Sequence, residues 1–307
     1  MDLPRIGVSL PHFGPYAGPE AVVTVAQAAE RAGLHAVSVS ERLLMPVRPG
    51  WSNDAGLPES HVWDPIEMLT WAAAHTARVR VATCIVNAIF QPPILLARRL
   101  ATLDRLSGGR LDAGLGQGGG GTEETGYLIP EEFAAAGVPL GRRGAGFVEH
   151  LAAMRACWGP DPVEFAGQRY QIPSSTVGPK PYGATIPVFL GALVQSTAER
   201  AARVADGIVL AAVDWDATRA QVGWYRAAGG RGTVVVNTFT TALGPATPAD
   251  EFVASVLADA ERASAAGADE MHLTMNLGDP VPPDRQAELL AALGVALGLG
   301  SAGGPAS

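Results

Sequence analysis

Residues 5–40, RIGVSLPHFGPYAGPEAVVTVAQAAERAGLHAVSVS, contain the pattern that decides the fold: a short apolar run, a longer segment of helical period, and a second short apolar run. The helical segment ends at Gly33, and glycine is the residue type that most often follows the last turn of a helix. Both apolar runs have the near-continuous hydrophobicity of strands that are covered on two faces. Residues 5–40 therefore predict one β–α–β unit of a parallel sheet.

The same alternation continues along the chain, and eight such units can be counted. The predicted strands are 5–10, 36–40, 80–86, 111–116, 186–190, 207–210, 233–238 and 270–275. The predicted helices are 20–32, 65–76, 93–106, 144–158, 196–204, 216–228, 248–266 and 283–297. Asp64 before Pro65 and Thr247 before Pro248 predict side-chain N-caps, and Gly267 predicts a helix end. Eight units in 307 residues favour an α/β fold of the (β/α)8 TIM-barrel type over the alternative, a doubly wound sheet.

Two long segments interrupt this alternation. Residues 44–63 are rich in Pro, Gly and Ser, and a loop of this length is commonly a lid or a binding element. Residues 159–187 contain two β-like pieces around a turn near 164–170. Neither segment shifts in composition, so we predict a single domain over 1–299 with insertions in its loops. Residues 300–307, rich in Gly and Ala, predict a flexible C-terminal tail.

The composition is that of a globular enzyme. The formal net charge of −8 supplies no basic surface for a phosphate backbone, so we expect no nucleic-acid partner. The apolar run 289–299 is too short to span a membrane and the first residues lack the pattern of a secretory signal, so we expect a cytoplasmic protein without a membrane partner. Cys84 and Cys157 are too few for a disulfide framework, and the six histidines lack metal-ligand spacing, so we expect no metal site.

A glycine-rich loop follows the fourth predicted strand. Residues 114–119, GLGQGG, match the dinucleotide fingerprint G-x-G-x-x-G, but residues 120–122 continue as loop where that fingerprint requires a helix. Three interpretations are open: a nicotinamide site, a flexible surface loop, and backbone that approaches a cofactor at the strand's carboxyl end. We favour the third, because active sites of (β/α)8 barrels lie at that end.

Two further features point to the same end of the barrel. Residues 187–196, PVFLGALVQS, lead from a strand through small residues into a helix, and the free amide groups of a helix N-terminus bind phosphate; a tight connection without a ligand is the alternative. His12 follows the first strand, which places it near the predicted mouth.

Cys84 is better explained as a small buried residue than as a nucleophile. No G-x-S-x-G motif is present, which disfavours a serine hydrolase of the common α/β type.

Four motifs in order along the chain carry a family resemblance. They are 26–41 (AQAAERAG followed by AVSVSE), 101–111 (ATLDRLSGGRL), 177–181 (VGPKP) and 201–207 (AARVADG), of which the second is the most specific. Together they resemble the luciferase-like monooxygenase superfamily, in particular its branch that uses the deazaflavin coenzyme F420. The resemblance covers nearly the whole chain and implies a bacterial luciferase-like TIM barrel.

The resemblance also implies a cofactor and its site. Coenzyme F420, an 8-hydroxy-5-deazaflavin, or alternatively FMN, is expected across the barrel mouth, and a bulge with a non-prolyl cis peptide is expected at Cys84-Ile85. Glu41 would end the second strand beside the cofactor. The implied cofactor-binding residues are Thr83, Cys84, Ile85, Asn87, Gln117 and Gly118, with the phosphate at Gly191, Ala192, Leu193 and Val194.

Departures from the family pattern narrow the expected reaction. Family sugar dehydrogenases have an acid–histidine pair after the second strand and a glutamate after the fourth, where this chain has Glu41-Arg42 and Gly119, so we do not expect sugar-phosphate dehydrogenation. The resemblance implies hydride transfer between a reduced deazaflavin and a small substrate such as a conjugated alkene, imine or carbonyl. Candidate proton donors are His12, Glu41 and His61. Monooxygenation with FMN and molecular oxygen and a non-catalytic flavin-binding barrel are the alternatives, and a homodimer is expected.

Overall fold

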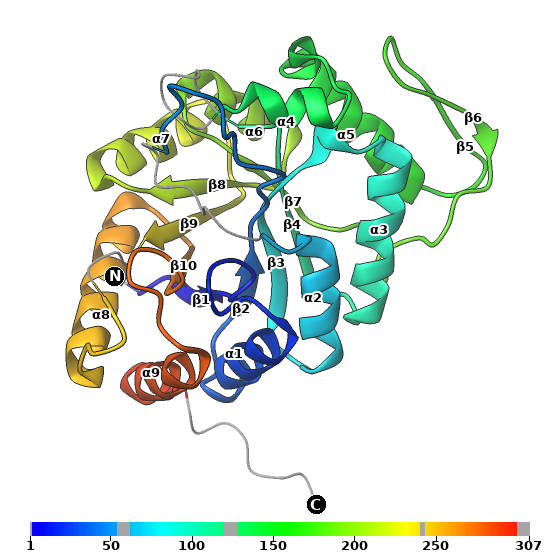
Figure 1. Ribbon diagram of the computed structural model, residues 1–307. Helices are drawn as coiled ribbons and strands as arrows, with labels where there is room; N and C mark the ends of the chain where they lie inside the picture. The colour runs from blue at the N-terminus through cyan, green and yellow to red at the C-terminus, as the bar shows by residue number, and fades with distance from the viewer. Residues whose placement is uncertain (1, 54–61, 120–127, 240–242, 300–307) are drawn as a thin grey trace, which may run out of the picture.

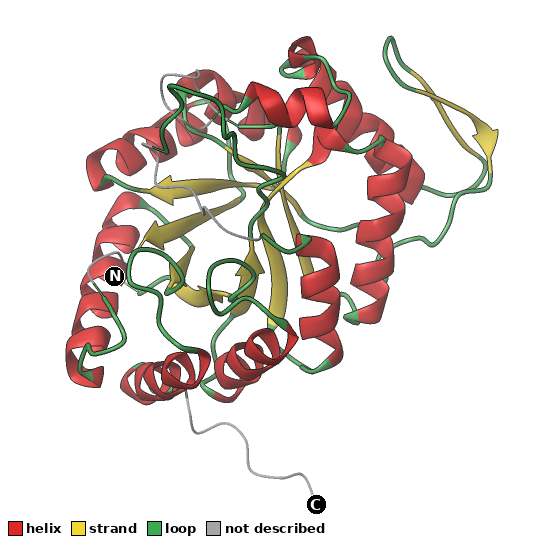
Figure 2. Cartoon of the chain, in the orientation of Figure 1, coloured by secondary structure: helices red, strands yellow, loops and turns green. Residues whose placement is uncertain are grey.

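The computed structural model describes residues 2–53, 62–119, 128–239 and 243–299, and these form a closed barrel of eight parallel strands surrounded by helices (Figure 1, Figure 2). The barrel strands are β1 Arg5–Ser9, β2 Ala36–Val39, β3 Arg80–Asn87, β4 Leu111–Gly116, β7 Val188–Gly191, β8 Gly207–Ala212, β9 Thr233–Phe239 and β10 Glu270–Thr274. The first strand pairs with both β2 and β10, which closes the sheet. The predicted (β/α)8 barrel is confirmed, and the doubly wound alternative is wrong.

The helices lie on the outside of the barrel. Those that connect successive strands are α1 Pro19–Arg31, α2 Pro65–Ala74, α3 Pro93–Leu106, α5 Ala145–Trp158, α6 Gln195–Val204, α7 Trp215–Ala227, α8 Ala249–Ala266 and α9 Pro283–Ala296. Each was predicted within two residues at both ends. The structure adds the short helices η1 Ala88–Phe90, α4 Pro130–Ala135 and η3 Leu140–Arg142, which were not predicted because six residues or fewer carry too little periodicity.

The helix-end predictions have mixed outcomes. The Asp64 side chain accepts hydrogen bonds from the amides of Ile66 and Glu67, so the predicted cap of α2 is confirmed. Gly33 and Gly267 follow α1 and α8 at φ values of 76° and 87°, which glycine adopts readily. The predicted Thr247 cap is wrong, because the Thr247 hydroxyl instead accepts from the amide of Gly244 within a tight turn.

The segment between α5 and β7 extends away from the barrel (Figure 1). It contains the antiparallel strands β5 Val163–Ala166 and β6 Gln171–Ser175, which confirm the two β-like pieces expected there.

Among the described residues, no helix has the length and apolarity needed to cross a membrane. The main hydrophobic core lies between the barrel and its helices. A smaller apolar group, formed by Phe189, Val209 and Val235, lies inside the barrel.

Candidate active site at the barrel mouth

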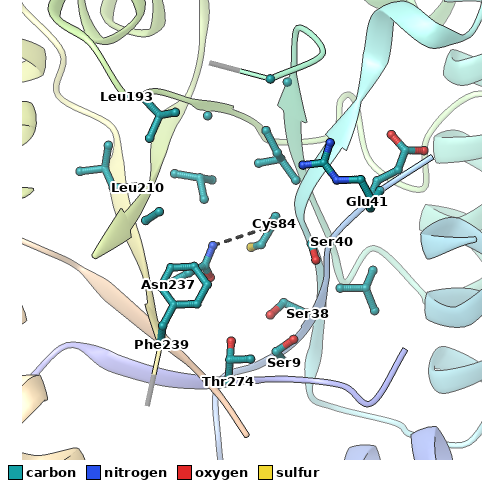
Figure 3. A pocket seen from close by; sticks show the side chains of 18 of the residues that line it. Ser9, Ser38, Ser40, Glu41, Cys84, Leu193, Leu210, Asn237, Phe239 and Thr274 are labelled. Carbon is teal, nitrogen blue, oxygen red and sulfur yellow. Dashed lines mark hydrogen bonds between the residues drawn. The ribbon is translucent and has the colours of Figure 1, made fainter. Parts of the chain in front are cut away.

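A cavity of about 600 Å³ opens at the carboxyl ends of the barrel strands, and its size is typical of a small-molecule or cofactor site. Polar side chains at its base come from Ser9, Ser38, Cys84, Asn237 and Thr274 (Figure 3). Apolar groups including Ile85, Leu193, Leu210 and Phe239 form much of its wall. This combination of an apolar wall with a few polar groups suits a flat organic ligand.

The end of β3 gives the cavity its shape. The Cys84–Ile85 peptide bond is cis, and the pairing with β4 shifts in register between Thr83 and Val86, so the predicted bulge and cis peptide are confirmed. The Glu41 amide donates to the Ile85 carbonyl oxygen at 3.0 Å, and the Asn237 side chain donates to the Cys84 carbonyl oxygen at 3.4 Å (Figure 3). The bulge is therefore fixed from both sides of the cavity.

Two glycines leave room for the side chain that the bulge presents. A Cβ atom at Gly116 of β4 or at Gly191 of β7 would overlap Cδ1 of Ile85. A third glycine, Gly114, allows β4 to approach the backbone carbonyl of Thr83. Glycine is needed at these positions because backbone and side chain approach too closely for any larger residue.

Glu41 is the predicted proton donor that lines the cavity. It lies at the cavity margin in Figure 3, and its Oε2 accepts from the Asn87 amide at 2.6 Å. Burial raises the pKa of Glu41 to about 7 against the lowering effect of that hydrogen bond, and the nearby carboxylates of Asp64 and Glu132 raise it further. A carboxyl group of this pKa exchanges protons near neutral pH, as a general acid must.

His12 lies outside the cavity lining. Its ring is fully buried, with Nδ1 2.8 Å from the Leu10 carbonyl oxygen and Nε2 accepting from the Ser40 amide at 2.9 Å. Burial lowers the pKa of His12 to about 4, so the ring is neutral and joins the ends of β1 and β2. His61, the other candidate donor, lies outside the described residues. Glu41 is thus the candidate that the structure brings to the cavity among the described residues.

Seven of the ten expected cofactor residues line the cavity, namely Cys84, Ile85, Asn87, Gln117, Gly191, Ala192 and Leu193. Thr83 is buried and donates to the Gly114 carbonyl oxygen, Gly118 packs against Phe133, and Val194 is the exposed N-cap of α6. The hydroxyl residues of the floor, Ser9, Ser38 and Thr274, were not predicted. They stand at or next to the last residues of their strands, which is the signal that could have identified them.

A buried ion pair that the sequence did not predict connects the loop after β2 to α4. Arg42 lines the cavity, and its Nη1 lies 2.9 Å from Oε2 of Glu132 in α4. The other carboxylate oxygen of Glu132 accepts from the Leu43 amide at 2.7 Å. Glu132 is 1% exposed, so this pair fastens the loop after β2 to α4 in a buried setting.

Positive charge gathers beside the start of α6. Arg200 Nη1 lies 2.9 Å from the Gln117 side-chain oxygen, and Arg143 Nη2 lies 3.4 Å from the Gly119 carbonyl oxygen. Neither guanidinium forms an ion pair with a carboxylate among the described residues. Burial lowers the pKa of Arg200, and the positive charges of Arg203 and Arg143 lower it further. An anion at this end of the cavity would relieve that repulsion.

The α6 N-terminus itself is partly satisfied. The amides of Leu193 and Val194 each lie 3.2 Å from the Thr197 hydroxyl oxygen, which donates in turn to the Val194 carbonyl oxygen. Thr197 also lines the cavity. At the expected phosphate position the Thr197 hydroxyl group thus already accepts from two backbone amides, and Arg143 and Arg200 lie outside the cavity lining. Among the residues that the structure describes, no group of three His, Cys, Asp or Glu side chains is placed to hold a metal ion.

Comparisons with known proteins give the family. The sequence model described as luciferase-like monooxygenase matches residues 5–245. An uncharacterized protein of Mycobacterium tuberculosis is 34% identical over 199 residues, which cover 62% of this chain and 67% of that protein. An F420-dependent glucose-6-phosphate dehydrogenase of Amycolatopsis mediterranei is 29% identical over 196 residues, 62% of this chain and 53% of the relative.

A solved structure agrees. The monooxygenase RslO1 from Streptomyces bottropensis superposes with a TM-score of 0.73 at 23% identity, over 95% of this chain and 98% of that one, which shows a shared fold. The chain therefore belongs to the luciferase-like monooxygenase family and is an oxidoreductase.

Proposed function

We propose that this protein is a coenzyme F420-dependent oxidoreductase that transfers a hydride between the cofactor and a small conjugated alkene, imine or carbonyl compound. The observation that carries the proposal is the pair Arg143 and Arg200, two cations without a carboxylate partner among the described residues. They contact Gln117 and Gly119, which line the cavity. The side chain of coenzyme F420 carries a phosphate and additional carboxylates, whereas that of FMN ends in a single phosphate. Surplus positive charge at this end favours the more anionic cofactor.

The cavity residues fit the cofactor's flat ring system. Ile85 presents an apolar surface at the bulge, and Gly116 and Gly191 leave the space that its side chain occupies. Asn87, Gln117 and the segment 191–193 would hold the cofactor from β3, β4 and β7. When bound, the deazaflavin supplies or accepts the hydride, and the protein contributes orientation, exclusion of water and a proton.

The protein's own contribution is proton supply and substrate orientation. Glu41 holds a transferable proton at the cavity margin near neutral pH. Ser9, Ser38 and Thr274 form the floor of the cavity, where their hydroxyl groups can orient a carbonyl or imine group of the substrate (Figure 3). Leu193 and Leu210 provide the apolar wall that limits the access of water.

Replacement of the two arginines tests the proposal. We expect Arg200→Ala and Arg143→Ala each to raise the Kd for coenzyme F420 at least tenfold, which corresponds to a loss of about 1.4 kcal/mol. The Kd for FMN should rise less than about threefold, because FMN lacks the additional carboxylates that the pair is proposed to bind. Fluorescence titration of each variant with each cofactor provides the measurement.

Arg219→Ala is the matched control. Arg219 pairs with Asp216 on the exposed surface of α7, so its loss should leave both affinities unchanged. If Arg200→Ala and Arg143→Ala lost equal affinity for FMN and coenzyme F420, or lost affinity for neither, the arginine pair would not bind the deazaflavin side chain as proposed.

A further inference from the structure

Ser40 follows β2 and brings a hydroxyl group to the cavity, with the imidazole ring of His12 behind it. Ser40 lines the cavity on the same side as Ser38 (Figure 3). Its Oγ lies 3.1 Å from Nε2 of His12, and its backbone amide donates to the same nitrogen at 2.9 Å. His12 is fully buried and lies outside the cavity lining. A hydroxyl group that a ligand can reach is thus attached to a ring that a ligand cannot reach.

Two backbone groups determine which nitrogen of the His12 ring carries the proton. Nδ1 lies 2.8 Å from the Leu10 carbonyl oxygen, which can only accept, so Nδ1 carries the proton. Nε2 faces the Ser40 amide, which can only donate, so Nε2 carries the lone pair. Burial lowers the pKa of His12 to about 4, which keeps the ring in this neutral form at neutral pH. The ring therefore presents an acceptor to Ser40.

The acceptor on His12 determines the direction of the Ser40 hydroxyl group. The hydroxyl hydrogen points to Nε2, because any other direction would leave a lone pair of Oγ facing the lone pair of the ring at 3.1 Å. The described residues form no other hydrogen bond with Oγ of Ser40, so its lone pairs remain for a ligand. Ser40 is therefore a fixed hydrogen-bond acceptor in the cavity.

A fixed acceptor distinguishes among the alkene, carbonyl and imine groups named above. A carbonyl oxygen is itself an acceptor, and the carbon atoms of an alkene form no comparable hydrogen bond. The nitrogen of an N-unsubstituted imine carries an N–H group that can donate to Ser40 Oγ. This N–H group is retained when the imine becomes an amine. An imine and its amine product therefore both satisfy Ser40, whereas a carbonyl oxygen would face its lone pairs.

We propose that Ser40 is a specificity-determining residue that accepts a hydrogen bond from the reacting nitrogen of an N-unsubstituted imine, with His12 as its positioning residue. The assignment rests on the hydride-transfer function proposed above. The lone pair of the imine nitrogen takes the proton of Glu41, the imine carbon accepts the hydride of the reduced deazaflavin, and the C=N electron pair moves to nitrogen. The products are a neutral amine, the Glu41 carboxylate and the oxidised deazaflavin.

Two planar probes of equal size test this selectivity without cofactor or turnover. Benzamidine, protonated at neutral pH, presents only N–H donors, whereas acetophenone presents one acceptor oxygen. We expect the wild-type protein to bind benzamidine more tightly, as measured by isothermal titration calorimetry. Ser40→Ala should raise the Kd for benzamidine by about fivefold or more, because a hydrogen bond to a charged donor is lost. The Kd for acetophenone should not rise.

His12→Phe gives the sharper result, because the two probes should respond in opposite directions. Phenylalanine keeps an aromatic ring at residue 12 but cannot accept, so the Ser40 hydroxyl group becomes free to donate into the cavity. The Kd for acetophenone should then fall by about threefold or more, and the Kd for benzamidine should rise. A purely structural role of His12 would instead weaken the binding of both probes.

Two further variants serve as controls. Ser40→Thr keeps the hydroxyl group and should keep the wild-type preference for benzamidine. Ser264→Ala is the matched control, because it removes a hydroxyl group on α8 that donates to the Asp2 carbonyl oxygen ahead of β1, at the opposite end of the barrel from the mouth. Both affinities should be unchanged in Ser264→Ala.

The proposal would be overturned if the wild-type protein bound acetophenone as tightly as benzamidine, or bound no benzamidine. Equal changes for the two probes in Ser40→Ala would also overturn it. If His12→Phe does not fold, Ser40→Ala decides alone. The probes require no cofactor, so a preference of the protein for FMN would leave these results unchanged, and the two proposals fail separately.

Discussion

Glu41→Gln is expected to lower kcat for hydride transfer by about 10²-fold or more, because a positioned general acid contributes that much. Glutamine keeps the side chain's size and can still accept the hydrogen bond from the Asn87 amide. Cofactor affinity should therefore change less than about threefold. Steady-state kinetics and cofactor titration of the two proteins separate these quantities, and Glu261→Gln on the exposed face of α8 serves as the control.

The pH dependence gives this prediction a second readout. For substrate reduction, wild-type kcat should fall as pH rises through about 7, where Glu41 loses its proton, and the variant should lack this limb. The folded-state pKa lies above the ordinary value, so the protonated carboxyl group contributes stability at low pH that is lost as pH rises through about 7.

That loss amounts to about 3 kcal/mol between pH 4.5 and pH 8, and Glu41→Gln should not show it. Denaturant unfolding of both proteins across this range provides the comparison. Parallel stability curves for wild type and variant would show that Glu41 titrates normally.

Gly114→Ala is expected to destabilise the protein by about 3 kcal/mol, near the upper end for overpacking substitutions. The new methyl group would meet the backbone carbonyl of Thr83, which cannot move as a side-chain tip can. Because Thr83 precedes the bulge at Cys84–Ile85, the displacement should also weaken cofactor binding. Chemical denaturation and cofactor titration measure the two effects.

Gly223→Ala supplies the matched control for this substitution. Gly223 lies on the exposed face of α7, where an added Cβ atom meets nothing within 4 Å. The same chemical change should therefore stabilise the protein there, by about 0.5–1 kcal/mol. A Gly114→Ala protein as stable as wild type would mean that β3 and β4 do not approach as closely as described.

The repeating architecture was predictable because each strand and each long helix carries its own periodicity. The run 111–116, for example, is buried along its whole length, and α2 begins where Asp64 and Pro65 predict. Thr247 shows the limit of such local signals. As an N-cap, its hydroxyl oxygen would accept from an amide of α8. In the folded turn it accepts from the Gly244 amide instead.

The site was less predictable because its residues meet only in the closed barrel. The bulge at Cys84–Ile85 was expected from the family resemblance, not from any periodicity. Arg143 and Arg200 are distant in sequence and come together around Gln117. His12 lies at the ends of β1 and β2, as its position after the first strand predicted, but it does not line the cavity because backbone groups contact both ring nitrogens.

The central claim is that the cavity binds a deazaflavin in preference to FMN. Titration of the purified protein with each cofactor, followed by quenching of tryptophan fluorescence, tests it most directly. We predict tight binding of coenzyme F420 and binding of FMN at least tenfold weaker, a difference of about 1.4 kcal/mol. Preference for FMN would contradict the claim and favour oxygen-dependent monooxygenation, and binding of neither cofactor would contradict it in favour of a barrel without this chemistry.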